Sequence, residues 1–132
     1  MAAVREVRAL FASVNADSAA PAPTAPVPTE LERAFAALPR SVRATFVRFT
    51  LEELATLAPG NSVEVRVPPL GVTQCVAGPR HTRGTPPSVV ETSPVVWAAL
   101  VLGACSWEQA VAAGVFDASG ERSDLSTLLP LF

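Results

Sequence analysis

Apolar side chains recur at three- and four-residue spacing in three segments of the first half of the chain. The first stripe consists of Val4, Val7, Phe11 and Val14. It predicts a short amphipathic helix over residues 3–14, within an N-terminal unit of residues 1–16. Two further stripes predict a helix that begins at Thr29, with Thr29 and Glu32 in capping-box spacing, and a longer helix over residues 41–58.

A Pro- and Ala-rich stretch separates the first predicted helix from the rest. Residues 17–28 contain Pro21, Pro23, Pro26 and Pro28, a composition that favours an extended linker. The first helix is therefore expected to be tethered. It can pack on its own domain, on a twin subunit or on another protein. Residues 29–132 are expected to form one domain.

Strict alternation of apolar and polar residues replaces the helical spacing after Gly60. Val63, Val65 and Val67 alternate with Glu64 and Arg66, which predicts a half-buried strand. Pro68 and Pro69 end this strand, and a hairpin is expected to lead into a second strand over residues 72–76. Further strands are predicted over residues 89–92 and 115–118. The sheet should have about four or five short strands.

Two short helices are predicted between the last two strands, each with a side-chain cap at its start and a glycine at its end. These signals are Ser93 with Pro94, Ser106 with Gln109, and the closing Gly103 and Gly114. A terminal helix is expected after the last strand, because Asp124 suits a helical first turn, where its charge meets the helix dipole.

Composition narrows the class of protein. The 132 residues are 49% hydrophobic, which argues against disorder, and all ten cations are Arg, which indicates a high-GC bacterial source. The formal net charge of −2 disfavours nucleic-acid binding. Arg5, Glu6 and Arg8 exclude a secretory signal, and the apolar run over residues 95–102 is too short to cross a bilayer. A soluble, cytoplasmic protein without integral membrane association is therefore expected.

One segment carries side chains suited to binding an anionic group. Arg80, His81 and Arg83 lie between glycines in a predicted loop, and guanidinium groups bind carboxylates or phosphates through paired hydrogen bonds. The loop either holds an anionic head group or is an ordinary solvated Arg-rich loop. No ligand spacing for a metal and no catalytic motif accompanies it, so neither a cofactor, a metal site nor an enzyme is expected. Cys75 and Cys105 are expected to be free, buried thiols.

A set of large apolar side chains is the candidate lining of a ligand cavity. It comprises Phe46, Phe49, Trp97, Leu100, Trp107 and Val111. The same residues also suit a closed core, because hydrophobic periodicity reports which side chains face inward and not whether they meet. The sequence leaves both interpretations open.

The C-terminal third resembles a known fold. Its order of helix, helix and strand, with Trp97, Leu100, Gly103, Trp107, Ala110, Val111, Gly114, Gly120 and the closing leucines, resembles the end of the sterol-carrier-protein-2 fold. The bacterial sterol carrier branch is the more similar one, over roughly residues 40–132. The resemblance implies an α/β domain of α+β type, with a mixed sheet of about four to five short strands covered by helices. The N-terminal helix on its Pro/Ala-rich linker is an addition to that fold.

The same resemblance implies a function. It is the non-catalytic binding or carrying of an apolar ligand, such as a lipid, a fatty acyl chain or an isoprenoid, with its tail between helices and sheet and its head near Arg80, His81 and Arg83. The alternative is a protein-interaction or dimerisation module with a closed core, accessory to an enzyme, for which a homodimer is one form. Residues 78–87 are Pro-rich and polar where a typical member continues with strands.

Overall fold

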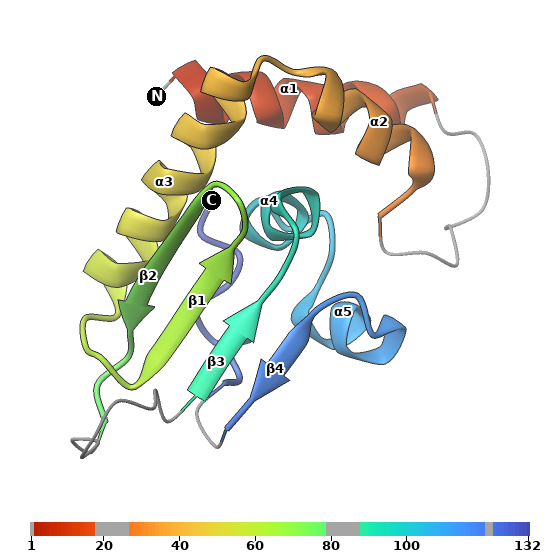
Figure 1. The fold of residues 1–132 in the computed structure, drawn as a ribbon. Helices are drawn as coiled ribbons and strands as arrows, with labels where there is room; N and C mark the ends of the chain where they lie inside the picture. The colour runs from red at the N-terminus through yellow and green to blue at the C-terminus, as the bar shows by residue number, and fades with distance from the viewer. Residues whose placement is uncertain (1, 18–26, 79–87, 121–122) are drawn as a thin grey trace.

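The computed structural model describes residues 2–17, 27–78, 88–120 and 123–132. Within them the chain forms five helices and four strands (Figure 1). In chain order these are α1 (Ala2–Asp17), α2 (Thr29–Ala37), α3 (Arg40–Leu57), β1 (Val63–Val67), β2 (Gly71–Cys75), β3 (Ser88–Glu91), α4 (Pro94–Leu102), α5 (Trp107–Ala113) and β4 (Asp117–Ser119). The predicted mixed α/β fold with a short-stranded sheet is confirmed.

The strands form one mixed sheet in the order β2-β1-β3-β4. β1 pairs antiparallel with β2, as the predicted hairpin requires, and parallel with β3, while β3 pairs antiparallel with β4. Because side chains alternate along a strand, Val63, Val65 and Val67 share one face of the sheet, and Glu64 and Arg66 share the other.

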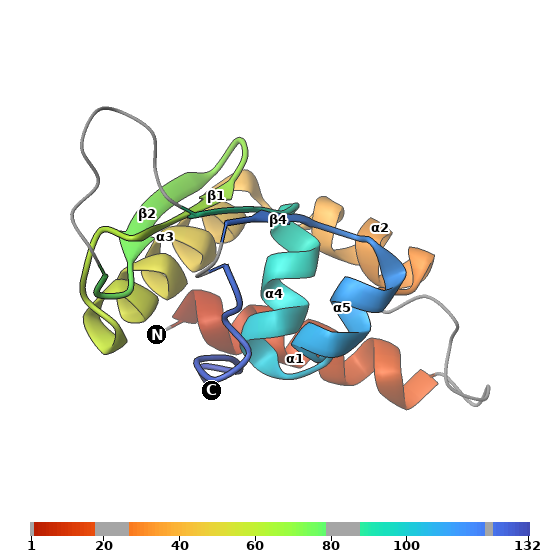
Figure 2. The same cartoon turned by 90° about the horizontal axis from the view of Figure 1, so that it is seen from below.

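The helices cover one face of this sheet. Figure 2 shows α3, α4 and α5 on one side, with α1 farther from the sheet on that same side. We call the covered face the inner face. No described segment covers the opposite, outer face (Figure 2). The fold therefore has two main layers, with the hydrophobic core between them.

The core centres on α4. Every residue of α4 from Val95 to Val101 is buried, so this helix is apolar on all sides. The indole Nε1–H of Trp97 donates a 2.8 Å hydrogen bond to the hydroxyl oxygen of Thr50, which links α4 to α3. In the apolar stripe of α1, Val4, Val7 and Phe11 are buried and Val14 is partly buried, and α1 packs on α2 and α3. The N-terminal helix thus packs on its own chain.

The predicted caps of α4 and α5 are confirmed. The Ser93 side chain accepts from the backbone of α4, and Ser106 and Gln109 form both bonds of a capping box. Both closing glycines have a left-handed backbone. The predicted cap of α2 is wrong: Pro28 is the N-cap, and Thr29 makes no capping hydrogen bond because it already lies within the helix.

Several element boundaries differ from the predictions, and one predicted helix does not form among the residues that the structure describes. β2 ends at Cys75, because Val76 takes a φ of +66° and turns the chain out of the strand. β4 begins only at Asp117. The expected terminal helix is absent from residues 123–132, which form turns instead. Asp124 accepts a 2.9 Å hydrogen bond from the backbone N–H of Ser126, so its carboxylate closes a local turn instead of starting a helix.

Candidate functional site

Three of the six predicted lining residues lie in the centre of the core. Phe46 is fully buried, and Trp97 and Leu100 are each 1% exposed. They face the valines of the inner face of the sheet, Val63, Val65, Val67 and Val90, which are equally buried. In this structure these side chains are packed core, so the arrangement favours the closed interpretation at this position.

The other three lie nearer the surface. Phe49 is partly buried, and its ring stacks on that of Phe132 at a centroid distance of 6.3 Å. Trp107 is 8% exposed and packs against Phe116, with ring centroids 4.6 Å apart. Val111 is 57% exposed on α5, so it lines no interior surface. The six residues therefore differ in burial, from the centre of the core to the exposed surface of α5.

A C-terminal segment, residues 123–132, closes the helical side of the core near Phe49. The side chain of Leu125 is fully buried in the core, and Leu128, Leu129 and Leu131 pack against it. Its backbone attachment to α4 consists of two hydrogen bonds, from Leu131 N (3.0 Å) and Phe132 N (3.4 Å) to the carbonyl oxygen of Val101. Side-chain packing holds this segment more than regular backbone pairing does.

The predicted basic loop lies outside the described residues, so the structure does not locate Arg80, His81 or Arg83. The two cysteines are free and buried, as predicted. Burial raises the pKa of the Cys75 thiol to about 11 and also raises the pKa of Cys105, so both stay protonated and weakly nucleophilic at neutral pH.

In the described part of the chain, His, Cys, Asp and Glu side chains form no group of three or more that could hold a metal ion. No helix there has the length and apolar character needed to span a membrane.

The outer face of the sheet carries an ordered row of side chains. Its members are cross-strand partners: Val72 pairs with Arg66, Arg66 with Glu91, and Glu91 with Asp117. We call these four residues, one from each strand, the outer row. The Arg66 guanidinium binds Glu64 on its own strand through hydrogen bonds of 2.6 and 2.9 Å, so it is not directed at Glu91.

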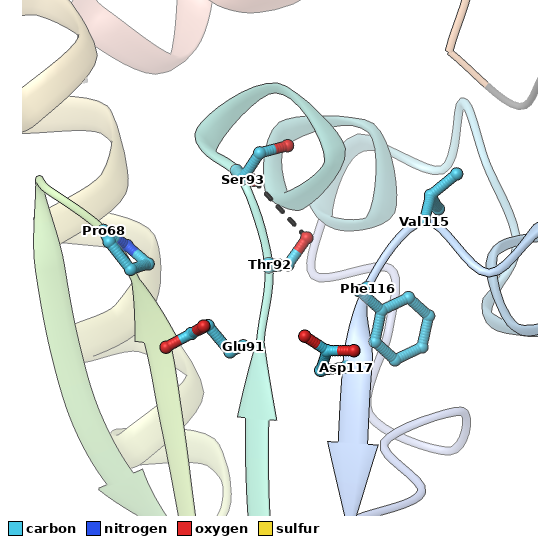
Figure 3. Close-up of a pocket in the computed structure, with 7 residues that line it drawn as sticks. All are labelled: Pro68, Glu91, Thr92, Ser93, Val115, Phe116 and Asp117. Atoms are coloured by element: carbon cyan, nitrogen blue, oxygen red, sulfur yellow. Dashed lines mark hydrogen bonds between the residues drawn. The ribbon is translucent and has the colours of Figure 1, made fainter.

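Three neighbouring hollows follow the outer row and share residues with one another. One, of about 480 Å³, lies at the β1–β2 turn and includes Pro68, Pro69 and Val72. A second, of about 310 Å³, lies over β1, β3 and β4 and includes Arg66, Glu91 and Asp117. The third, of about 270 Å³, is lined by Pro68, Glu91, Thr92, Ser93, Val115, Phe116 and Asp117 (Figure 3). Together they form a shallow depression across the sheet.

The alternation of apolar and polar residues along β1 predicts that Glu64 and Arg66 point outward, but it does not predict the outer row. The row depends on the parallel pairing of β1 with β3 and on the placement of β4, and neither follows from residues near in sequence. A register shift by one residue would send Glu91 to the inner face. Sequence reasoning therefore missed the outer row.

Comparison with protein families identifies the part of the chain that forms the sheet and helices α3 to α5. The sequence profile of a family described as "Bacterial SCP ortholog" matches residues 39–131, which include α3 to α5 and all four strands. A search of curated proteins returns no match to the chain. Helices α1 and α2 precede the matched region. Because the match extends over more than half of the chain, the protein belongs to the bacterial sterol carrier protein (SCP) ortholog family.

Proposed function

We propose that the protein is a non-catalytic carrier that binds an apolar ligand, a fatty acyl chain or an isoprenoid, between the helices and the inner face of the sheet. One observation carries the proposal: the family match covers the two layers whose facing surfaces are largely apolar. Such surfaces make dispersion contacts with an acyl chain and exclude it from water. Each buried CH₂ then contributes roughly 0.8 kcal/mol to the free energy of binding.

Among the described residues, Phe46, Trp97 and Leu100 are packed in the core, so we propose that a segment moves to admit the ligand. The C-terminal segment is the candidate, because its leucines and Phe132 bury apolar surface while only two backbone hydrogen bonds join it to α4. Displacing it would uncover apolar side chains of α3 and α4, including Phe49. An acyl chain can replace these contacts with contacts of the same kind, so the exchange costs little free energy.

The polar end of the ligand is proposed to lie at Arg80, His81 and Arg83. Their guanidinium groups suit a carboxylate or phosphate head, and each charge-assisted hydrogen bond contributes about 1.5–3 kcal/mol. Arg80→Ala and Arg83→Ala should each weaken binding of a fatty acid about tenfold or more, while binding of the corresponding alkane alcohol should change less. If both variants bind the fatty acid with the same affinity as the wild type, this loop is not part of the binding site.

The first test is a native mass spectrum of gently purified protein, followed by identification of any adduct after denaturation. The second measures the affinity for saturated fatty acids of increasing length, by displacement of the fluorescent fatty acid cis-parinaric acid. Each added CH₂ should lower Kd by roughly fourfold until the available space is full. A bare protein mass together with a flat chain-length series would refute the carrier function.

The alternative is an interaction module whose interior stays closed. The near-complete burial of Phe46, Trp97 and Leu100 favours it. Phe132→Ala separates the two functions. It removes the ring stacked on Phe49, so a carrier that opens there should bind the fatty acid faster. Val111→Ala is the matched control, because Val111 is exposed on α5 and its truncation should leave the rate unchanged.

A further inference from the structure

The outer face contains an unfavourable pair of charges. Glu91 and Asp117 are directly opposite each other on β3 and β4, and like charges at such positions destabilise a sheet. Within the described residues the only salt bridge joins Arg66 to Glu64, so neither carboxylate has a cation within 4.0 Å. The neighbouring Arg66 would suit Glu91, yet it is held by Glu64. A cation from outside would relieve this repulsion.

The two carboxylates are not arranged around a single ion. In Figure 3 the Glu91 carboxylate turns towards Pro68, whereas that of Asp117 lies beside Phe116. Two separate cationic groups therefore fit the face better than one metal ion. Side chains of arginine or lysine on one extended segment provide such groups at regular spacing.

Apolar surface accompanies the charges. Val72, at the β2 end of the outer row, is 59% exposed, and the hollows beside the row include Pro68, Pro69 and Phe116. Four strands about 4.8 Å apart span roughly 14 Å, which corresponds to about four residues of an extended chain. The depression thus offers an apolar site at its β2 end and two carboxylates at its β3 and β4 end, within reach of the side chains that an extended segment of about five residues directs to one face.

We infer that the outer face docks an extended basic segment of a protein partner, with its cationic side chains on Glu91 and Asp117 and its apolar side chains beside Val72 and Pro68. The sign of the charge argues against the other large partners. An anionic membrane surface and a nucleic acid would both be repelled by two carboxylates that no cation of the described residues neutralises. The inference does not depend on whether the interior binds a lipid, since it uses the opposite face of the sheet.

The test uses the whole 132-residue chain and the fluorescein-labelled pentapeptide Val-Gly-Arg-Gly-Arg, whose valine and arginines share one face when it is extended, and follows binding by fluorescence anisotropy at physiological salt. The double variant Glu91→Gln/Asp117→Asn should bind the peptide at least tenfold more weakly than the wild type. The control Glu52→Gln/Glu53→Gln makes the same change in net charge on the exposed surface of α3, and its affinity should stay within twofold of the wild type. Amide chemical-shift changes should centre on β3 and β4.

Removing the like-charge repulsion should also raise the melting temperature of the first double variant, so weaker binding cannot be attributed to unfolding. Absence of saturable binding, or equal losses in the two double variants, would overturn the proposal. So would self-association of the protein that this double substitution abolishes, since it would identify a second copy as the occupant. Displacement of the peptide by Ca²⁺ at a low stoichiometric ratio would likewise overturn it, in favour of a metal site.

Discussion

Replacing Thr50 by valine tests how tightly the interior is closed. The Thr50 hydroxyl is fully buried, donates to a carbonyl oxygen of its own helix and accepts the indole N–H of Trp97 at 2.8 Å. Valine keeps the branched shape but cannot accept a hydrogen bond. The indole N–H of Trp97, which is 1% exposed, would then have no partner and no water within reach.

The expected cost follows from that orphaned donor. An unsatisfied buried N–H costs about 1–3 kcal/mol, whereas a surface substitution stays within about 0.5 kcal/mol. For a chain of this length the melting temperature changes by about 4 °C per kcal/mol. Thr50→Val should therefore melt roughly 4–12 °C below the wild type.

The assay is urea and thermal unfolding followed by tryptophan fluorescence and circular dichroism. Thr56→Val is the matched control, because Thr56 lies on the exposed side of α3 and its hydroxyl bonds only to a backbone carbonyl of that helix. In a double-mutant cycle, Trp97→Phe removes the donor, so Thr50→Val should cost little in that background. If Thr50→Val and Thr56→Val are equally stable, water reaches Trp97 and the interior is not closed there.

Two further stability predictions concern the backbone turn and the thiols. Gly60→Ala should destabilise the fold by about 3 kcal/mol or more in urea unfolding, because Gly60 has a φ of +149° and a Cβ there would overlap the carbonyl of Val76. Gly114→Ala, at a φ of +64° with open space around it, should cost only about 1 kcal/mol; equal losses would contradict this reasoning. Stability should fall as pH rises from 9.0 towards 11, because the Cys75 thiol has its ordinary pKa of 9.0 in the unfolded chain, whereas burial raises that pKa to about 11 in the folded protein. If the stability of Cys75→Ala falls with pH as steeply as that of the wild type, other groups cause the fall.

Much of the fold was accessible from the sequence because its signals are local. The caps at Ser93 and Ser106 and the glycines that end their helices depend on residues within one turn. The alternation at Val63–Val67 likewise identifies a strand and its buried face. The family resemblance extended these elements to a whole architecture, which the match over residues 39–131 confirms.

The terminal segment shows why local signals fail. Asp124 suits a helix start by its position, but its carboxylate accepts from Ser126 in a turn, and the following leucines pack on the core without forming a helix. A short helix gains most of its stability from tertiary packing. Whether it forms is therefore decided by the surface it meets, not by its first turn.

The sequence by itself indicated helices α1 to α5 and strands β1 to β4, apart from their bounds and a terminal helix that does not form. It also indicated which valines of β1 are buried and that the two cysteines are free thiols. Only the tertiary structure decided that Phe46, Trp97 and Leu100 meet in a packed core, and that Val72, Arg66, Glu91 and Asp117 form one row. The physical reason is range. Capping and periodicity act between neighbours along the chain, whereas packing and strand register join residues that are distant in sequence. Packing and register therefore depend on how the helices and the sheet fit together.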